Sequence, residues 1–125
     1  MLSLPLLKQV SVVGMSALAV AECIYSDHID ILVELAGHTQ HSRFDELTRR
    51  AAPIQVSWLG YPNTTGLNSI DYRLTDAISD DPDTQHQYTE TLFRLDHIFL
   101  CYEPLKLLFA EVLCLFAFLV HTYEY

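Results

Sequence analysis

Apolar residues near the start of the chain recur at the spacing of a helix. One side of such a helix would carry Val13, Ala17, Val20, Ala21 and Ile24. Apolar residues gathered on one side of a helix pack that side against a neighbouring element. The pattern therefore predicts a buried helix in this segment.

Short apolar runs that end in turn-forming residues follow this helix. Residues 30–35, DILVEL, lead directly into Ala36 and Gly37, and a run of this kind is typical of a buried parallel strand. Residues 43–50 then predict a second helix, because acidic residues open it and arginines close it, as the helix dipole favours. These charged residues are Asp45, Glu46, Arg49 and Arg50.

A second strand is predicted at residues 54–59, directly after Pro53, which would end the preceding helix. Apolar and polar residues alternate along it, so one side is expected to face the core. The inward residues would be Ile54, Val56 and Trp58, with Gln55 and Ser57 facing outward. Trp58 is therefore interpreted as a core residue rather than as a platform for a sugar.

The remaining part of the sheet is predicted from shorter runs. Residues 72–75 are a third strand candidate, and the acidic segment 76–83 after it should face solvent. Residues 88–95 predict a helical turn and residues 98–102 a fourth strand, before Pro104 interrupts the pattern. Alternating helices and buried strands predict an α/β fold with a mainly parallel sheet. Four strands are few for a complete doubly wound domain, so we expect a partial Rossmann-like sheet cut from a larger domain.

The composition limits the classes of partner. Sixteen acidic residues against seven basic ones give a net charge of −9, which disfavours binding to nucleic acid and to anionic membranes. The three cysteines, Cys23, Cys101 and Cys114, form no CxxC pair and no even set, so a reducing compartment is expected. The apolar run 107–120 is shorter than the roughly 20 residues that span a bilayer, and we expect a helix there that packs against a partner.

The start of the chain also permits a second interpretation. Lys8, the apolar run 10–20 and the small residues Ala19 and Ala21 together imitate a secretory signal peptide. The single lysine, however, follows four apolar residues, and helical spacing explains the same segment. A buried helix is the preferred prediction, and secretion with a mature chain beginning at Glu22 is the alternative.

Three blocks in the middle of the chain carry the most specific signal. In order, they read DHIDILVELAGHT, AAPIQVSWLGYPNTTGLNSIDYRLTDAISDDPDT and YTETLFRLDHIFLCYEP. Their order and spacing resemble the catalytic region of the O-GlcNAc transferase and SPINDLY family of protein O-glycosyltransferases. The resemblance covers residues 22–104 and leaves two apolar segments, residues 1–21 and 105–125, unmatched.

The resemblance implies the amino-terminal half of a GT-B glycosyltransferase, in which two Rossmann-like halves face each other across a cleft. It implies transfer of GlcNAc from UDP-GlcNAc, or of fucose from GDP-fucose, to Ser and Thr of cytoplasmic or nuclear proteins, without cofactor or metal. In full-length relatives tetratricopeptide repeats precede the catalytic region, and the nucleotide site and an essential lysine belong to its carboxyl-terminal half. Without that half, the chain is expected to be inactive alone. A non-catalytic module that docks through its apolar terminal helices is the alternative.

Candidate contact residues lie on two loops that follow predicted strands. His38 and Thr39 come after the first strand and Gly37, and the turn-rich loop 60–66, GYPNTTG, follows the second. Ligands of open α/β sheets bind at the carboxyl ends of the strands, so both loops are expected to line one rim and contact the sugar or the acceptor. The second loop contributes Gly60, Tyr61, Pro62, Asn63, Thr64 and Thr65.

These residues also have a structural interpretation. His38 would then cap backbone groups, and the hydroxyls of Thr64 and Thr65 would bond within their own loop. No residue is assigned as the general base. The basic residues are scattered and no glycine-rich phosphate loop follows a strand, so the nucleotide is expected to bind elsewhere.

Two patterns imitate metal sites. Residues 81–83, DPD, imitate the DxD motif of metal-dependent glycosyltransferases, but they are better interpreted as solvated surface. His38 and His41 have no further ligand at a spacing suited to zinc. No metal is therefore expected. A structural ion pair, or the end of a strand, is the interpretation for Asp71, Arg73 and Asp76.

Overall fold

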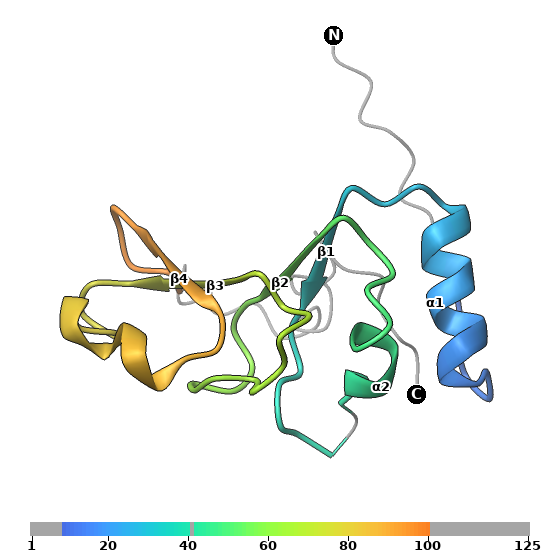
Figure 1. Cartoon of the computed structure of the whole chain (residues 1–125), viewed down its shortest axis with the longest axis horizontal. Coiled ribbons are helices and arrows are strands. Elements are labelled where there is room, and N and C mark those ends of the chain that lie inside the picture. The colour runs from blue at the N-terminus through green and yellow to red at the C-terminus, as the bar shows by residue number, and fades with distance from the viewer. Residues whose placement is uncertain (1–8, 41, 101–125) are drawn as a thin grey trace, which may run out of the picture. The chain divides into compact units, whose positions relative to one another are not determined.

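Four parallel strands form the sheet of this protein (Figure 1). The computed structural model describes residues 9–40 and 42–100, and its helices and strands all belong to the unit Ser16–Glu103. The strands lie side by side in chain order: β1 (Ile31–Glu34), β2 (Ile54–Ser57), β3 (Tyr72–Asp76) and β4 (Thr91–Leu95). Every neighbouring pair is parallel. The predicted α/β fold with a parallel sheet is confirmed.

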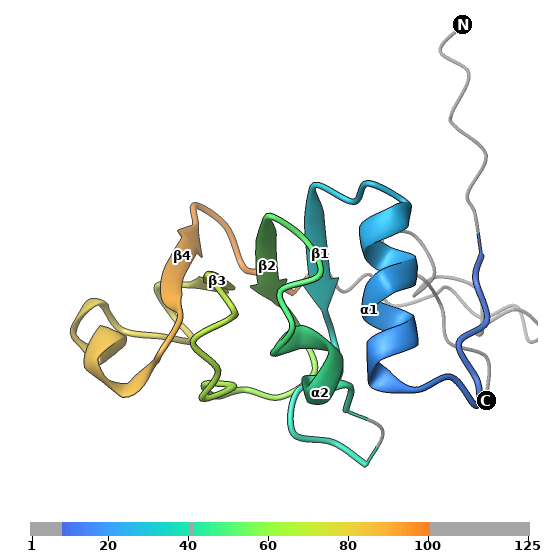
Figure 2. The same ribbon diagram turned by 45° about the vertical axis from the view of Figure 1, so that its right-hand side comes forward.

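One helix precedes β1, and two others lie in the connections between β1 and β2 and between β3 and β4. They are α1 (Ala17–Ser26), α2 (Phe44–Leu47) and the 3₁₀ helix η1 (Pro82–Gln87). Figures 1 and 2 show α1 and α2 beside each other next to β1, whereas β4 forms the other edge of the sheet. A loop without a helix joins β2 to β3. Within the described residues, no helix is long and apolar enough to cross a membrane.

The two predicted helices differ from the observed ones in their bounds. The first begins only at Ala17, because the Ser16 hydroxyl accepts a hydrogen bond from the Ala19 amide and caps the helix. Gly14, inside the predicted run, has a φ of +76°, which a helix does not permit. The second helix is a single turn, and Arg50, with a φ of +50°, lies beyond its end. The predicted arginine-closed helix over residues 43–50 is therefore wrong in length.

The fourth strand is also displaced from its prediction. Residues 91–95, expected to belong to a helical turn, pair with β3 over five consecutive positions. Residues 98–100 form no strand, and the rest of the predicted segment lies outside the described residues, as does the predicted helix at 107–120. The acidic segment 76–83 is solvent-facing only in part, because Asp76 and Asp80 are buried.

The buried face of the sheet is the one that the pattern of β2 predicted to face outward. Residues paired in the parallel register share a face, and the face that carries Gln55, Ser57 and Arg73 is buried. The opposite face carries exposed apolar side chains, including Ile31 at 55% and Phe93 at 54% exposure. In β2, the prediction is wrong for Ile54, which is exposed, and for Gln55 and Ser57, which are buried, whereas Val56 is buried as predicted. Trp58 is half-buried, and its indole Nε1 donates to the Phe99 carbonyl at 3.2 Å.

Candidate functional site

The two predicted loops are in contact. The ring of His38 lies 5.0 Å from that of Tyr61, edge to face, and its Nε2 is 3.2 Å from the carbonyl oxygen of Thr64. His38 also meets the ring of Phe44, the first residue of α2, at 4.8 Å. The predicted placement of the histidine and threonine loops along one rim of the sheet is confirmed. The second loop then turns back over the buried face of the sheet, where Arg73 of β3 holds it.

The contact with Thr64 fixes the proton of the His38 ring. A carbonyl oxygen only accepts hydrogen bonds, so Nε2 carries the hydrogen in this interaction. In the neutral ring, Nδ1 then keeps its lone pair. Because His38 is exposed, this nitrogen is available to accept a hydrogen bond from a hydroxyl group.

Two glycines allow the backbones to approach each other where the loops leave their strands. A Cβ atom at Gly37 would overlap the Cβ of Tyr61, and Gly37 also has a φ of +58°. A Cβ atom at Gly60 would overlap the carbonyl oxygen of Leu35. A side chain at either position would push the loops apart.

A buried carboxylate holds the loop that follows β1. Oε1 of Glu34, the last residue of that strand, accepts from the amides of Ala36 at 2.6 Å and Gly37 at 2.9 Å. Burial raises the pKa of Glu34, and the two backbone hydrogen bonds offset part of that rise. This carboxylate fixes the backbone from which His38 projects.

A second buried carboxylate holds the loop that follows β2. Glu90, which is fully buried, accepts from the Thr65 amide at 2.6 Å and from the Thr64 hydroxyl at 2.7 Å. The Thr65 hydroxyl also donates to it. Burial raises the pKa of Glu90, but the bonds from Thr65 and Thr64 outweigh that effect, and the pKa lies below its usual value. Both hydroxyls thus bond within the protein.

Arg73 holds the same loop from the β3 side. Its Nη1 donates to the carbonyl of Tyr61 at 2.9 Å and to that of Asn63 at 3.3 Å. Only 3% of Arg73 is exposed, and the Asp80 carboxylate lies 3.8 Å from its Nε. The side chains that remain on the loop surface are those of Tyr61, Pro62 and Asn63. The contact role of these residues, and of Thr39, stays a prediction.

Charged residues around β3 pair differently from the prediction. Asp71 binds Arg50 at 2.7 Å and Arg73 lies near Asp80, so both form ion pairs, but not with each other or with Asp76. Asp76 is the last residue of β3 and so ends the strand, which was the alternative interpretation. Asp76 accepts backbone amides, and its bond from the Phe99 amide is the main cause of a pKa below the usual range. Burial raises the pKa of Asp71, but the Gln55 amide and Arg50 lower it below its usual value.

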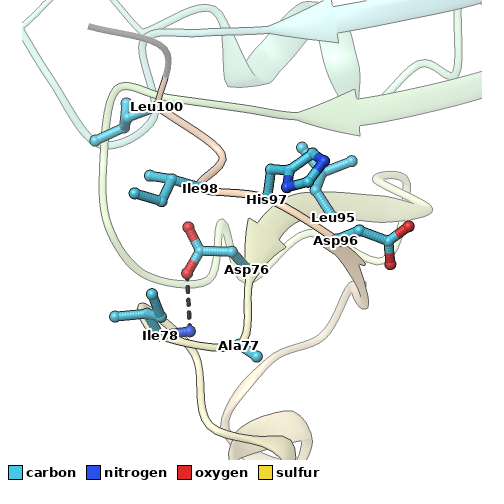
Figure 3. A pocket seen from close by; sticks show the side chains of 8 residues that line it. All are labelled: Asp76, Ala77, Ile78, Leu95, Asp96, His97, Ile98 and Leu100. Carbon is cyan, nitrogen blue, oxygen red and sulfur yellow. Dashed lines mark hydrogen bonds between the residues drawn. The ribbon is translucent and has the colours of Figure 1, made fainter.

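A shallow pocket of about 500 Å³ lies at the carboxyl ends of β3 and β4 (Figure 3). Aliphatic side chains line most of it, among them Ile78, Leu95 and Ile98. Asp76 lies between Ile78 and Ile98, but three backbone amides already occupy its carboxylate. Sequence reasoning missed this pocket because it assigned these segments to a solvated loop and a strand.

Of the two patterns that resemble metal sites, the one at residues 81–83 has a structural role, and the pair His38 and His41 lies partly outside the described residues. Asp81 caps η1 by accepting the Asp83 amide at 3.2 Å, and Pro82 is the first residue of that helix. His41 is not among the described residues. Within those residues, no group of three or more His, Cys, Asp or Glu side chains is placed to hold a metal ion.

Sequence reasoning missed Glu34 and Glu90, which hold the loops, and it assigned Arg73 to an ion pair without its bonds to the loop. A usable signal existed for two of them. Glu34 and Arg73 each interrupt an otherwise strand-like run, and a charge in a buried strand requires a partner. Glu90 had no such signal, because its partners are 25 residues away in the sequence.

Comparisons with known proteins agree with one another. The model for "Glycosyl transferase family 41" matches residues 7–111. The Oryza sativa subsp. japonica protein named probable UDP-N-acetylglucosamine-peptide N-acetylglucosaminyltransferase SPINDLY is 52% identical over 91 residues, 73% of this chain and 10% of that protein. A UDP-N-acetylglucosamine-peptide N-acetylglucosaminyltransferase from Caenorhabditis elegans is 42% identical over 79 residues, 63% of this chain and 7% of that protein.

A solved structure is similar as well. A mutant O-GlcNAc transferase from Thermobaculum terrenum superposes with a TM-score of 0.71 at 38% identity, over 74% of this chain and 18% of that chain. The chain spans about a tenth of the length of the curated relatives it matches.

Proposed function

Because the chain belongs to glycosyl transferase family 41, as its resemblance to O-GlcNAc transferases and SPINDLY proteins predicted, we propose that it forms part of the catalytic region of a protein O-glycosyltransferase. The reaction would transfer GlcNAc from UDP-GlcNAc to Ser and Thr of cytoplasmic or nuclear proteins. GDP-fucose is the alternative donor. We assign this chain to the wall of the cleft that faces the protein acceptor.

One observation carries this proposal. The exposed His38 ring and the loop 60–66 are joined at the carboxyl side of the sheet, with Nε2 of His38 committed to Thr64 and Nδ1 left as an acceptor. An attacking hydroxyl needs a group that orients it and accepts its hydrogen bond. His38 Nδ1 offers that interaction, and the exposed side chains of Tyr61 and Asn63 extend the same surface.

Charge favours the acceptor over the donor at this surface. A nucleotide sugar carries a diphosphate, which requires cations or unpaired backbone amides. Here the amides of Ala36, Gly37 and Thr65 already bind carboxylates. Four of the five arginines in the described residues bond protein oxygens: Arg43, Arg50, Arg73 and Arg94. A second Rossmann-like half would bind the diphosphate, so the chain is proposed to be inactive alone.

The open sheet face favours a second candidate function. Exposed apolar side chains from all four strands are unusual for a parallel sheet, which is normally covered on both faces. A module that docks another protein through this face, without catalysis, would use the same feature. Capture of a specific protein in the absence of any glycosyltransferase would favour this candidate.

The test of the main proposal is a binding experiment on the purified chain. Backbone NMR spectra would be followed during titration with UDP-GlcNAc, with GDP-fucose, and with a Ser-containing acceptor peptide. We expect signals of His38 and of residues 60–63 to shift with the peptide, and no shifts with either nucleotide sugar. A matched control is the His38→Ala chain, which should lose most of the peptide response. Tight binding of a nucleotide sugar, or no response to peptide, would refute the assignment.

A further inference from the structure

Glu90 anchors the second loop of the candidate site, the one that His38 contacts, although it belongs to neither loop. Resting on the proposed function, we propose that Glu90 is a positioning residue, which sets the orientation of His38 through Thr64 and so presents the site to the acceptor. The residue lies just before β4, on a different segment from both loops, and no part of it is exposed. It therefore acts on the acceptor only through the residues it binds.

The first link runs from Glu90 to the loop. Oε1 binds both the amide and the hydroxyl of Thr65, and Oε2 binds the hydroxyls of Thr64 at 2.7 Å and Thr89 at 3.2 Å. Both carboxylate oxygens are thus used, in a site without access to water. Hydrogen bonds to a buried charge are stronger than neutral ones, so this is a firm anchor for residues 64 and 65.

The second link runs from the loop to the ring. Thr64, whose hydroxyl is bound to Glu90, offers its carbonyl oxygen to Nε2 of His38 at 3.2 Å. On the other side of the loop, Arg73 fixes the carbonyls of Tyr61 and Asn63. Because Glu90 and Arg73 hold the loop from two sides, the Thr64 carbonyl points in one direction. That direction determines which nitrogen of the His38 ring faces outward.

The chemistry of the site requires a carboxylate at position 90 rather than an amide. The Thr64 hydroxyl already accepts from the amides of Gly66 at 3.0 Å and Thr89 at 3.2 Å. Its own hydrogen must therefore go to an acceptor, and Oε2 of Glu90 at 2.7 Å is nearer than the Thr89 hydroxyl oxygen at 3.0 Å and can only accept. A glutamine would keep an acceptor toward Thr65 but would turn a donor toward Thr64, where two donors are already present. Glu90→Gln should release one half of the anchor and keep the other.

The experiment compares three variants of the full chain. Glu90→Gln is the main variant, and Glu90→Ala removes the anchor entirely. Leu92→Ala is the matched control, because it lowers the stability of β4, the strand that follows Glu90, from a buried position that bonds to neither loop. NMR would report the ring signals of His38 and the hydrogen exchange of the Thr65 amide, and peptide titration would report affinity, all at a temperature where each variant is folded.

In Glu90→Gln we expect the chemical shifts of the His38 ring to change. Peptide affinity should fall about tenfold, because the substituted amide no longer accepts the hydrogen of the Thr64 hydroxyl. Leu92→Ala should leave both unchanged while it lowers the melting temperature. Ring signals in Glu90→Gln that match the wild type would overturn the inference, even if peptide still binds. If the wild-type chain binds no peptide, the proposed function fails whatever Glu90 does. Should Glu90→Ala not fold, the comparison of Glu90→Gln with Leu92→Ala decides alone.

Discussion

The two faces of the sheet contrast in chemistry and in closure. One face is polar and closed, since Gln55, Ser57, Arg73 and Thr75 are all buried there. The other carries exposed apolar side chains, namely Ile31, Ile54, Tyr72 and Phe93, although Val56 on the same face is buried. In this sheet the polar side chains of one face are therefore more buried than most apolar side chains of the other.

The difference explains how the loops are held. On the closed face, side chains from the strands reach backbone groups of the connections: Gln55 Nε2 donates to the carbonyls of Leu47 and Ser69, each at 2.8 Å. Leaving a buried polar group without a hydrogen bond costs more free energy than the hydrogen bond contributes when it is present. Contacts of this kind therefore favour one arrangement of the loops over the others. The open face has no such constraint, and its apolar side chains gain by meeting another surface.

The largest effect should come from removing the charge in the closed face. Arg73→Ala would remove the guanidinium that faces the buried Asp80 carboxylate, and it would free the carbonyls of Tyr61 and Asn63. Breaking a buried pair in this way costs about 3–5 kcal/mol, which is enough to unfold a small domain. Circular dichroism and the fluorescence of Trp58 would report the loss. Arg49→Ala, at an exposed position, is the control, and equal stability of the two variants would contradict this view of the closed face.

A smaller effect is expected where the two loops approach each other. Gly60→Ala places a methyl group against the Leu35 carbonyl oxygen, and the backbone shift required should cost about 1–3 kcal/mol. Gly66→Ala is the matched comparison, because its φ is +73° but nothing lies within 4 Å of the added atom. That variant should lose only about 1–2 kcal/mol, from backbone strain alone. Urea denaturation measures both, and a greater loss for Gly66→Ala would argue against crowding at Gly60.

The two buried carboxylates should respond to pH in opposite directions. The pKa of Glu90 lies below its usual value, so its contribution to stability is present above about pH 4.5 and is lost as the pH falls below that. The pKa of Glu34 is raised above its usual value of 4.5. The folded state therefore keeps this proton to a higher pH than the unfolded state. Between pH 4.5 and the pKa of the folded state, the free energy of unfolding falls as the pH rises. We expect Glu90→Gln to flatten the acid limb of the stability curve.

Glu34→Gln should instead remove the decline above pH 4.5, leaving the acid limb in place. Urea midpoints between pH 3 and pH 7 would separate the two behaviours. Parallel changes in both variants would mean that the two carboxylates do not differ as the structure indicates.

The smallest effect on stability is expected on the open face. Phe93→Lys replaces a half-exposed ring that supports no loop, so the free energy of unfolding should change by no more than about 0.5 kcal/mol. Self-association at high concentration should decrease, because the apolar patch is interrupted. Light scattering and thermal melting measure the two properties. A loss as large as that of Leu92→Ala, the neighbour on the closed face, would show that the two faces do not differ in this way.

Much of this fold follows from the sequence. The runs at β1, β2 and β3 end in glycine or in turn-forming segments, and they were predicted as strands with nearly the observed bounds. The meeting of the two loops followed from the rule that parallel strands end at one edge. β4 was predicted as a helical turn because TLFRL is short and its partner strand, not its own pattern, makes it extended.

The faces of the sheet could not be predicted by the alternation of apolar and polar residues. In β2 that alternation places Ile54 inside and Gln55 outside, whereas the structure does the reverse. Nε2 of Gln55 donates to carbonyls 8 and 14 residues away, and Glu90 accepts from hydroxyls 25 and 26 residues away. Such partners are known only once the chain is folded, so a pattern of local hydrophobicity does not find them.

The order of the strands has a consequence for how the chain acquires its structure. Since β1, β2, β3 and β4 neighbour one another in the order in which they are synthesised, each strand emerging from a ribosome meets a partner that is already formed. Among the described strands, β2, β3 and β4 each pair with the strand that precedes them in the chain, and the newest strand is one of the two sheet edges, with β1 as the other. Such a sheet can be assembled step by step during translation, with little opportunity for strands to pair in the wrong order.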